Sequence, residues 1–357
     1  MKRYFSILFT MLVILSVLVG CGGSDSNATT PSAAQNSTAA DNEVFEVKFA
    51  HAYATTAFHH EVAEFWKEKV EAASNGRIKV TIYPAAQLMP IDQEYAALLD
   101  GRIQANFSVS STAENLEQSY AIFNLPFVFG DTPEHLEAMK LFVQSDIYKN
   151  IILERFKEKG IMLYPGVTDP AGAFCTTKKR VESIADMAGL KMRILGGKWP
   201  ELTGKALGYS TITIAGAEMP TALMQGTVDG ALVRPIYITD TKVPINYVTM
   251  VPLDYGATCP LAVSKLFYDK LPADMQQVID DVGDELFIWC ADEVASRTEK
   301  SLEIMQKDMG IEVIYISDEE YQRMRELCKP VLDEFAKSIP DGQAIIDEAL
   351  RCSEQIS

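Results

Sequence analysis

The feature that most constrains the fold of this chain is an alternation of short strands with amphipathic helices. Residues 44–50 alternate apolar and polar side chains, as a half-buried strand does, and residues 58–73 keep the three-to-four spacing of a helix. Further strands are expected over 77–83 and 103–110, with a helix over 92–99 between them. This strand–helix–strand–helix–strand order is typical of a parallel sheet with helices on both faces.

A second group of strands and helices follows a helical stretch over 134–156. The expected strands are 161–168, 190–194, 211–214 and 228–233, and the expected helices are 199–207 and 217–225. Because single cores stop growing beyond about 250 residues, a chain of 357 residues is expected to form two lobes. We assign residues 43–168 and part of 250–357 to lobe 1, and residues 169–260 to lobe 2. The predicted fold class is therefore α/β with two lobes.

A long helical pattern runs over residues 271–309. It exceeds the usual helix length of about 8–20 residues and lacks the heptad seam of a coiled coil. Two explanations are open: the helix connects and spans both lobes, or it bends at Gly283. Residues 311–316 and two helices after Ser317 are expected to pack against the lobes.

The first 20 residues have the organisation of a secretory signal peptide. Lys2 and Arg3 precede a run without a charge over residues 4–19, which is short for the roughly 20 residues of a membrane-spanning helix. The run leads into residues 18–21, Leu-Val-Gly-Cys, which resemble the bacterial lipoprotein box. In that box the cysteine, here Cys21, becomes the lipidated first residue. An uncleaved anchor helix with an incidental cysteine is the alternative.

Residues 21–42 are expected to be the lipidated Cys21 followed by a flexible tether, because the segment is small and polar with almost nothing to bury. Several acyl chains on one cysteine give stable anchoring, at roughly 0.8 kcal/mol per buried CH₂. We therefore expect an exported chain that is lipid-anchored to a bacterial membrane through acylated Cys21, facing the periplasm or the cell exterior.

The charge of the chain argues against nucleic acid as a partner. The formal net charge is −17, and removing residues 1–20, which hold Lys2 and Arg3, leaves 30 − 49 = −19. Phosphate binding needs clustered lysines and arginines that displace counterions. No nucleic-acid partner is therefore expected.

The sequence contains none of the common catalytic or metal-binding motifs. G-x-S-x-G, H-E-x-x-H, a Walker loop and a G-x-G-x-x-G that opens a helix are all missing. His59 and His60 are adjacent at a helix start and point in different directions, so we interpret them as surface residues. The five cysteines besides Cys21 contain no C-x-x-C, although one disulfide is possible in an exported chain. We expect no catalytic residue, no metal and no cofactor.

Five segments occur in a fixed order along the chain: 76–88 (GRIKVTIYPAAQL), 125–129 (LPFVF), 184–193 (IADMAGLKMR), 217–230 (AEMPTALMQGTVDG) and 271–278 (LPADMQQV). In this order the chain resembles the substrate-binding subunits of tripartite ATP-independent periplasmic (TRAP) transporters of the DctP type, from about residue 44 to 340. The resemblance implies a periplasmic-binding-protein fold (type II-like) with a long helix spanning both lobes. It also implies lobe closure on a small organic acid and delivery to the small and large membrane subunits.

Arg193 is the strongest candidate for a ligand-binding residue. It stands at the carboxyl end of an expected strand, where ligands of open α/β sheets bind. Its guanidinium is a planar fork of donors that matches a carboxylate or sulfonate. An exposed arginine with a weak surface salt bridge is the alternative. The resemblance implies the first reading, because the family's arginine at this position holds the substrate carboxylate.

Other candidates for pocket lining follow the ends of expected strands. They are His51, Tyr53, Ser110, Glu218, Arg234 and Tyr237. Phe174 is a further candidate from the resemblance, because sugar-acid binders of the family carry a second arginine shortly after a glycine, where this chain has residues 172–174, Gly-Ala-Phe. Three have an alternative: Phe174 could pack in the core, Arg234 could face solvent, and His51 could be structural instead of donating to an anion.

One or two arginines with few other charged groups suit a small monoanion or a dianion, such as a hydroxy or keto acid, a C4-dicarboxylate or a sulfonate. Two alternatives are weighed against this ligand class. A binding protein for a sugar, an amino acid or a peptide could share the fold, and an exported enzyme on this scaffold would turn its acid over.

Overall fold

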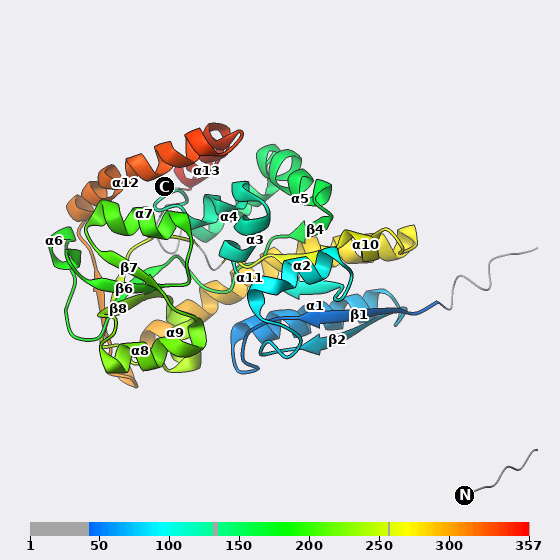
Figure 1. Ribbon diagram of the computed structural model, residues 1–357, viewed down its shortest axis with the longest axis horizontal. Helices are drawn as coiled ribbons and strands as arrows, with labels where there is room; N and C mark the ends of the chain where they lie inside the picture. The colour runs from blue at the N-terminus through cyan, green and yellow to red at the C-terminus, as the bar shows by residue number, and fades with distance from the viewer. Residues whose placement is uncertain (1–42, 131–134, 256–257, 357) are drawn as a thin grey trace, which may run out of the picture. The chain divides into compact units, whose positions relative to one another are not determined.

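The computed structural model describes residues 43–130, 135–255 and 258–356. The predicted signal peptide, the tether and the lipidated Cys21 lie outside these residues. Within them, no helix has both the length and the apolar character needed to cross a membrane. Two sheets, one in each lobe, organise this part of the chain (Figure 1).

Lobe 1 is built on a five-stranded sheet in the order β2-β1-β3-β10-β4. Its strands are β1 (Phe45–Ala50), β2 (Ile78–Tyr83), β3 (Ala105–Phe107), β4 (Ile161–Tyr164) and β10 (Leu261–Ser264). β1 is parallel to β2 and β3, whereas β10 is antiparallel to β3 and β4. In β1, Val47 and Phe49 are buried while Glu46 and Lys48 are exposed, so the alternation in the sequence predicts the buried face correctly.

The helices of lobe 1 are α1 (Phe58–Ala73), η2 (Ile91–Gln93), α2 (Glu94–Leu99), α3 (Ser110–Leu116), η3 (Gln118–Asn124), α4 (His135–Gln144), η4 (Tyr148–Leu153), α5 (Glu154–Glu158) and α10 (Lys265–Tyr268). The expected continuous helix over 134–156 is interrupted after α4. Ser145 provides the reason, because its Oγ accepts the backbone N–H of Tyr148 at 3.2 Å and so competes with the helical pattern.

Lobe 2 is built on a six-stranded sheet in the order β11-β9-β5-β8-β6-β7. Its strands are β5 (Ala173–Thr176), β6 (Lys191–Ile194), β7 (Ser210–Thr213), β8 (Gly230–Val233), β9 (Tyr247–Met250) and β11 (Glu312–Tyr315). β6 is parallel to β7 and β8, and β5 is antiparallel to β8 and β9. The helices are α6 (Ile184–Met187), α7 (Lys198–Leu207), η5 (Gly216–Glu218), α8 (Met219–Gln225) and α9 (Pro235–Thr241).

The long helix α11 (Ala273–Lys307) is continuous and contacts elements of both lobes, including α1 and β4 in lobe 1 and α9 and β11 in lobe 2. It does not break at Gly283. A Cβ on Gly283 would lie 2.2 Å from Cδ1 of Tyr164, so the glycine serves the close packing of α11 on β4. The helix therefore spans both lobes, the first of the two explanations open from the sequence.

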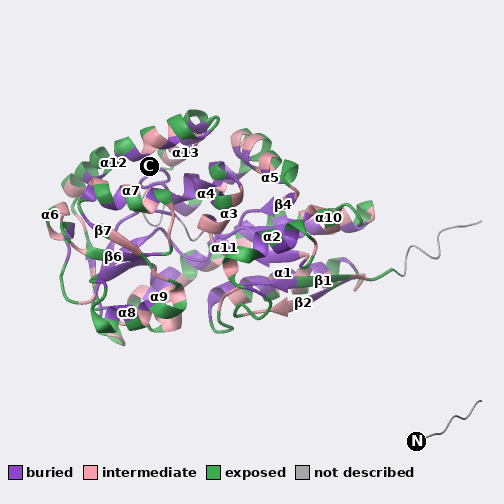
Figure 2. Ribbon diagram, in the orientation of Figure 1, coloured by how far each residue is buried: buried purple, intermediate pink, exposed green. Residues whose placement is uncertain are grey.

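Two C-terminal helices complete the fold. α12 (Asp318–Ser338) packs against α7 of lobe 2, and α13 (Gly342–Glu354) packs against α4 of lobe 1. Buried residues fill the central strands of both sheets and the inner faces of these helices (Figure 2). All five cysteines in the described chain are buried free thiols, so the disulfide that an exported chain could form is not formed among them.

Candidate functional site

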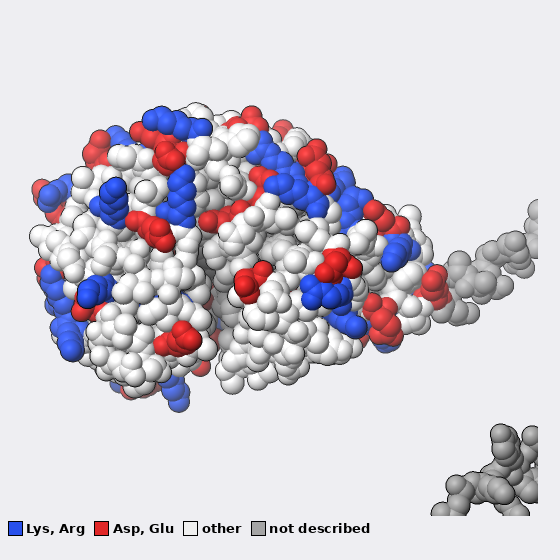
Figure 3. All heavy atoms as spheres, in the orientation of Figure 1, with Lys and Arg blue, Asp and Glu red and all other residues white. Residues whose placement is uncertain are grey.

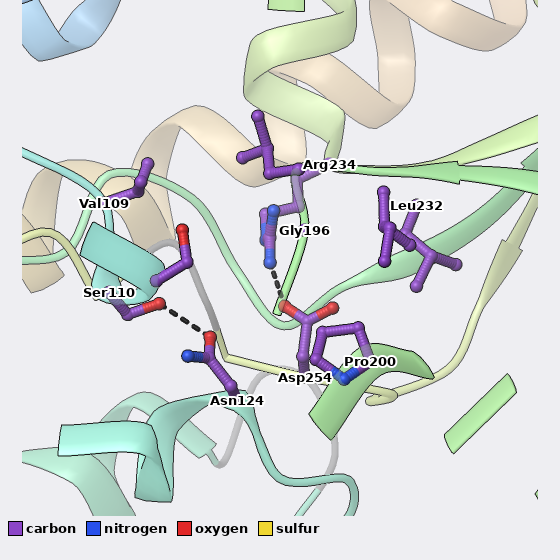
Figure 4. A pocket seen from close by; sticks show the side chains of 11 residues that line it. Val109, Ser110, Asn124, Gly196, Pro200, Leu232, Arg234 and Asp254 are labelled. Carbon is purple, nitrogen blue, oxygen red and sulfur yellow. Dashed lines mark hydrogen bonds and ion pairs between the residues drawn. The ribbon is translucent and has the colours of Figure 1, made fainter. Parts of the chain in front are cut away.

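A pocket between the lobes is lined from both sides. The lining residues are Val109, Ser110, Ser111 and Asn124 in lobe 1, Ile194, Leu195, Gly196, Pro200, Leu232 and Arg234 in lobe 2, and Asp254 on the segment that returns to lobe 1. On the face drawn in Figure 3, a furrow separates the two lobes, and most of the surface bordering its lower part is uncharged. Figure 4 shows the side chains that converge on the pocket.

Arg193 is the third residue of β6 and pairs with Ile212 of β7 and Ala231 of β8. Its side chain is almost fully buried, with 3% of its surface exposed. Nε donates to the carbonyl of Ile214 at 2.8 Å, whereas the buried Nη2 has no hydrogen-bond partner in the described chain. Burial lowers the pKa of Arg193 to about 10, so the group stays charged at neutral pH.

Gly216 and Tyr237 border the unpartnered end of Arg193. A Cβ on Gly216 would lie 3.4 Å from Oη of Tyr237 and 3.9 Å from Nη2 of Arg193, so both groups flank one spot beside the glycine. The backbone N–H of Tyr237 donates to Oδ1 of Asp169 at 3.1 Å, which fixes the start of α9. This spot brings a cation and a phenolic hydroxyl together, and both can donate to an anion.

Arg234 is the residue before α9, and its Nη2 forms an ion pair with Oδ1 of Asp254 (Figure 4). Both side chains are largely buried, at 14% and 7% exposure. Nε of Arg234 is buried without a partner in the described chain. The sequence left open whether Arg234 lines the pocket or faces solvent. In the structure it lines the pocket, and Asp254 neutralises its charge.

Lobe 1 contributes uncharged polar groups to the pocket wall. Ser110 Oγ donates to Oδ1 of Asn124 at 2.7 Å, and Nδ2 of Asn124 donates to Glu114. A Cβ on Gly197 would lie 3.4 Å from Oε1 of Glu114, so this carboxyl group approaches lobe 2 closely. Burial raises the pKa of Glu114 to about 7.

The first loop of lobe 1 holds an aromatic and imidazole cluster. His51 is fully buried; its Nδ1 accepts the N–H of Tyr53 at 3.2 Å, and its Nε2 lies 3.0 Å from Nδ1 of His60. The ring of His59 stacks on Tyr53 at 3.8 Å, and its Nε2 contacts Thr168. Burial lowers the pKa of His51 to about 4 and that of His59 to about 3, so both rings are neutral at pH 7.

Residues 49–338 match the family described as bacterial extracellular solute-binding protein, family 7, DctP. The match spans most of the chain and includes both lobes. The chain belongs to this family. The family assignment confirms the resemblance to TRAP substrate-binding subunits that the five sequence segments indicate.

Similar proteins support the same assignment. The C4-dicarboxylate-binding periplasmic protein DctP of Rhodobacter capsulatus is 28% identical over 301 residues, covering 83% of this chain and 88% of that protein. The 2,3-diketo-L-gulonate-binding periplasmic protein YiaO of Escherichia coli is 23% identical over 303 residues, covering 84% and 90%. These relatives are solute-binding proteins, and the family is extracytoplasmic.

Solved structures share the two-lobed fold. A TRAP periplasmic solute-binding protein of Shewanella oneidensis with bound succinate has a TM-score of 0.76 at 23% identity, covering 87% of this chain and 99% of that one. The sugar-acid-binding protein DctPAm of Advenella mimigardefordensis, in complex with galactonate, has a TM-score of 0.76 at 20% identity, covering 88% and 99%. The predicted α/β fold with two lobes is confirmed.

The sequence-predicted residues of this solute-binding protein divide into three groups. Arg193, Arg234 and Tyr237 lie at the carboxyl edge of the lobe 2 sheet, and Ser110 lies on the facing wall. Of these, Arg234 and Ser110 line the pocket, whereas Arg193 and Tyr237 flank the spot beside Gly216. His51 and Tyr53 lie in the first loop of lobe 1, and both ring nitrogens of His51 are engaged by protein groups, which fits its structural alternative.

Phe174 and Glu218 form the third group, which lies away from the pocket lining. Phe174 is fully buried in the core of lobe 2, where its ring meets Tyr209 edge-to-face at 5.1 Å. Glu218 is exposed at the end of η5. The interpretation of His59 as a surface residue is wrong, because the ring is buried against Tyr53. Tyr53 and Thr168, which contact the ring, are distant from the helix start along the chain or lie in its preceding loop, so the adjacent pair of histidines does not indicate the burial.

Sequence reasoning missed several residues of the site. Asn124 and Glu114 come from the segment after β3, and Asp169 and Asp254 come from the two segments on which the chain passes between the lobes. No local motif marks them. Asp254 lies 20 positions after the arginine that it neutralises, so only the fold brings the two together.

Proposed function

We propose that this solute-binding protein captures a small organic acid between its lobes, holds the carboxylate on Arg193 and delivers the acid to TRAP membrane subunits. The observation that carries the proposal is the buried guanidinium of Arg193, whose Nη2 has no partner in the described chain. A buried charge without a counter-ion is unfavourable by several kcal/mol, so such a group is retained where a ligand supplies the opposite charge.

The geometry around Arg193 suits a carboxylate. Nε is held by the carbonyl of Ile214, which orients the guanidinium, and Tyr237 offers a second donor beside the same spot. A fork of N–H groups with a neighbouring hydroxyl matches the two oxygens of a carboxylate or sulfonate. Ser110 and Arg234 face the pocket from the two sides and could bind the rest of the ligand.

Structural neighbours support the chemical class of the ligand. Those proteins were solved with succinate, galactonate, (S)-2-acetolactate, pyroglutamic acid and orotic acid. Each of these ligands is a small carboxylic acid. Lobe closure around the ligand would bury the carboxylate against Arg193 and exclude water, which strengthens the charge pair.

We further propose that the protein acts as a carrier and returns its ligand unchanged, held at a bacterial membrane by lipid on Cys21. The sequence offers a signal peptide, a lipoprotein box and a polar tether in that order. Replacing Cys21→Ser should move the exported chain from the membrane fraction to the soluble fraction. Retention of the variant in the membrane would contradict lipid anchoring.

Mass spectrometry of the ligand that co-purifies with the protein tests the proposed function directly. The expected result is a small organic acid, released unchanged when the protein is denatured. Recovery of a neutral sugar or a peptide would contradict the proposal, and so would conversion of the acid by the purified protein.

A further inference from the structure

The number of cationic side chains that have no protein counter-ion indicates the charge of the ligand that the site can bind. From it we infer that the site selects a small monocarboxylate that also carries a neutral oxygen, and discriminates against a dicarboxylate. This inference rests on the proposed function, because it requires Arg193 to bind the ligand carboxylate. It concerns which acid is bound, and it can fail while the proposed function holds.

The second arginine of the cleft does not offer a free charge. Arg234 and Asp254 are the only charged residues in the lining of the pocket as the described chain forms it, and they pair with each other. Asp254 is held in place on its own side, since its backbone carbonyl accepts the N–H of Gly172 at 2.8 Å. A Cβ on Gly172 would lie 3.1 Å from Oδ2 of Asp254, so the carboxylate rests directly against that glycine. The ion pair is therefore fixed rather than available for exchange with a ligand.

Two further acids lie near the pocket and disfavour a second negative charge on the ligand. Asp169 is buried and close enough to Arg234 for the arginine to oppose the rise of its pKa, which burial brings to about 7. Glu114 stands behind Asn124 on the facing wall. The buried rings of His51 and His59 add no positive charge at neutral pH. Arg193, which lies beside Gly216, has no ion pair among the described residues, whereas the one arginine of the pocket lining is paired. A second ligand carboxylate would therefore find only a paired cation and acids.

Hydrogen-bond donors and apolar side chains make up the rest of the wall. Nε of Arg234 is a buried donor with no partner among the described residues, and Ser110 and Ser111 carry hydroxyls. Ile194 and Leu232 are apolar. A hydroxyl or keto oxygen can accept from the Arg234 N–H without adding charge, which satisfies a donor that is otherwise left unpaired.

Matched pairs of acids test the inference by calorimetry on the full chain in mild detergent. 2-Hydroxybutyrate and malate have the same carbon count and differ by the second carboxylate, and so do 2-oxovalerate and 2-oxoglutarate. We expect each monocarboxylate to bind about 10-fold tighter than its partner, or more. Butyrate, which lacks the neutral oxygen, should bind about 10-fold weaker than 2-hydroxybutyrate.

The variant Asp254→Asn sharpens the test because it frees the charge of Arg234 and keeps the side-chain shape. Its preference should shift toward malate and 2-oxoglutarate by about 10-fold or more. The matched control Asp229→Asn, exposed on lobe 2 away from the pocket lining, should keep the unaltered preference. If Asp254→Asn does not fold, the ratio of monocarboxylate to dicarboxylate affinity in the unaltered chain tests the inference by itself.

The outcomes are distinguishable. Equal or tighter binding of the dicarboxylates by the unaltered chain overturns the inference and leaves the proposed function intact. Failure of all five acids to bind overturns the inference, and binding of a neutral sugar such as glucose in their place overturns the proposed function as well.

Discussion

The ends of β6 and β8 are neighbours in the sheet of lobe 2, and each carries a largely buried arginine, Arg193 and Arg234. At the end of β8, Arg234 has a carboxylate partner in Asp254. In β6, Nε of Arg193 donates to a backbone carbonyl, and its Nη2 has no partner among the residues that the structure describes. Both regions hold a largely buried arginine, but only the arginine after β8 has a carboxylate counter-ion among the described residues. The difference teaches that two arginines of one sheet edge can differ in whether the protein supplies the opposite charge, and our proposal assigns ligand binding to the unpaired one.

The largest expected effect comes from removing the unpaired charge. Arg193→Ala should weaken binding of the preferred acid on the order of 1000-fold, about 4 kcal/mol, because a buried charge pair with the ligand is lost. Thermal stability of the empty protein should hardly fall, since an uncompensated buried charge is removed. Calorimetry and thermal melts check both parts.

The exposed Arg323 of α12 supplies the control for that experiment, and Arg323→Ala should leave affinity unaltered. Unchanged affinity in Arg193→Ala would refute the role of Arg193. A large drop in its melting temperature without ligand would show that the arginine stabilises the fold, as Arg234 does.

The paired region should respond in the opposite way. Asp254→Ala leaves a second buried guanidinium without a counter-ion, so the free energy of unfolding should fall by about 3 kcal/mol. Denaturant unfolding of the ligand-free protein measures this loss. A variant as stable as the unaltered chain would mean that Asp254 does not stabilise the charge of Arg234, and the contrast with Arg193 would be lost.

The space beside Arg193 gives a smaller effect. Gly216→Ala puts a methyl group 3.4 Å from Oη of Tyr237 and 3.9 Å from Nη2 of Arg193, which are ordinary contact distances. The variant should therefore fold normally but bind the acid about 10-fold weaker, because the methyl group occupies the place of a ligand oxygen. Ala217→Ser, exposed in the same turn, should keep full affinity. Equal affinity for Gly216→Ala would place the carboxylate elsewhere.

The smallest expected effect is on pH dependence. Burial raises the pKa of Asp169 to about 7 against the opposing effect of Arg234, and burial raises the pKa of Glu114 to about 7. As the pH falls from 8 to 6, both acids gain protons and lose negative charge, so affinity for an anion should rise about threefold. Asp169→Asn, which keeps the acceptor for Tyr237 N–H, should flatten the profile, measured by calorimetry across this range.

Asp169 and Glu114 also determine the direction in which the stability of the fold changes with pH. Their pKa values are raised in the folded state, so folded protein holds protons that unfolded protein has released between about pH 4 and pH 7. Their contribution is present at low pH and is lost as the pH rises through about 7. Comparison of Asp169→Asn with the unaltered chain isolates this contribution, and an opposite trend would contradict the burial of Asp169.

The sequence alone determined the first elements of lobe 1 and the position of Arg193 on a strand of lobe 2, but it did not predict strands β5, β9 and β10, which form the antiparallel pairings of the two sheets. Period-two and period-three-to-four patterns depend on local chain geometry, so strand β1 and helix α1 follow directly from apolar spacing. The family segments and the strand end of Arg193 are equally local. The interruption after α4 and the burial of His59 were missed, because contacts with Ser145 and Tyr53 override the local pattern.

Only the tertiary structure decided which charges are compensated. Asp254 reaches Arg234 because the chain crosses back toward lobe 1 after β9, and Phe174 turns into the core because its strand packs against Tyr209. Electrostatic pairing acts through space, and the distance between two side chains is set by the path of the whole chain. A one-dimensional pattern can therefore mark an arginine as a candidate, while the fold determines whether that arginine already has a partner.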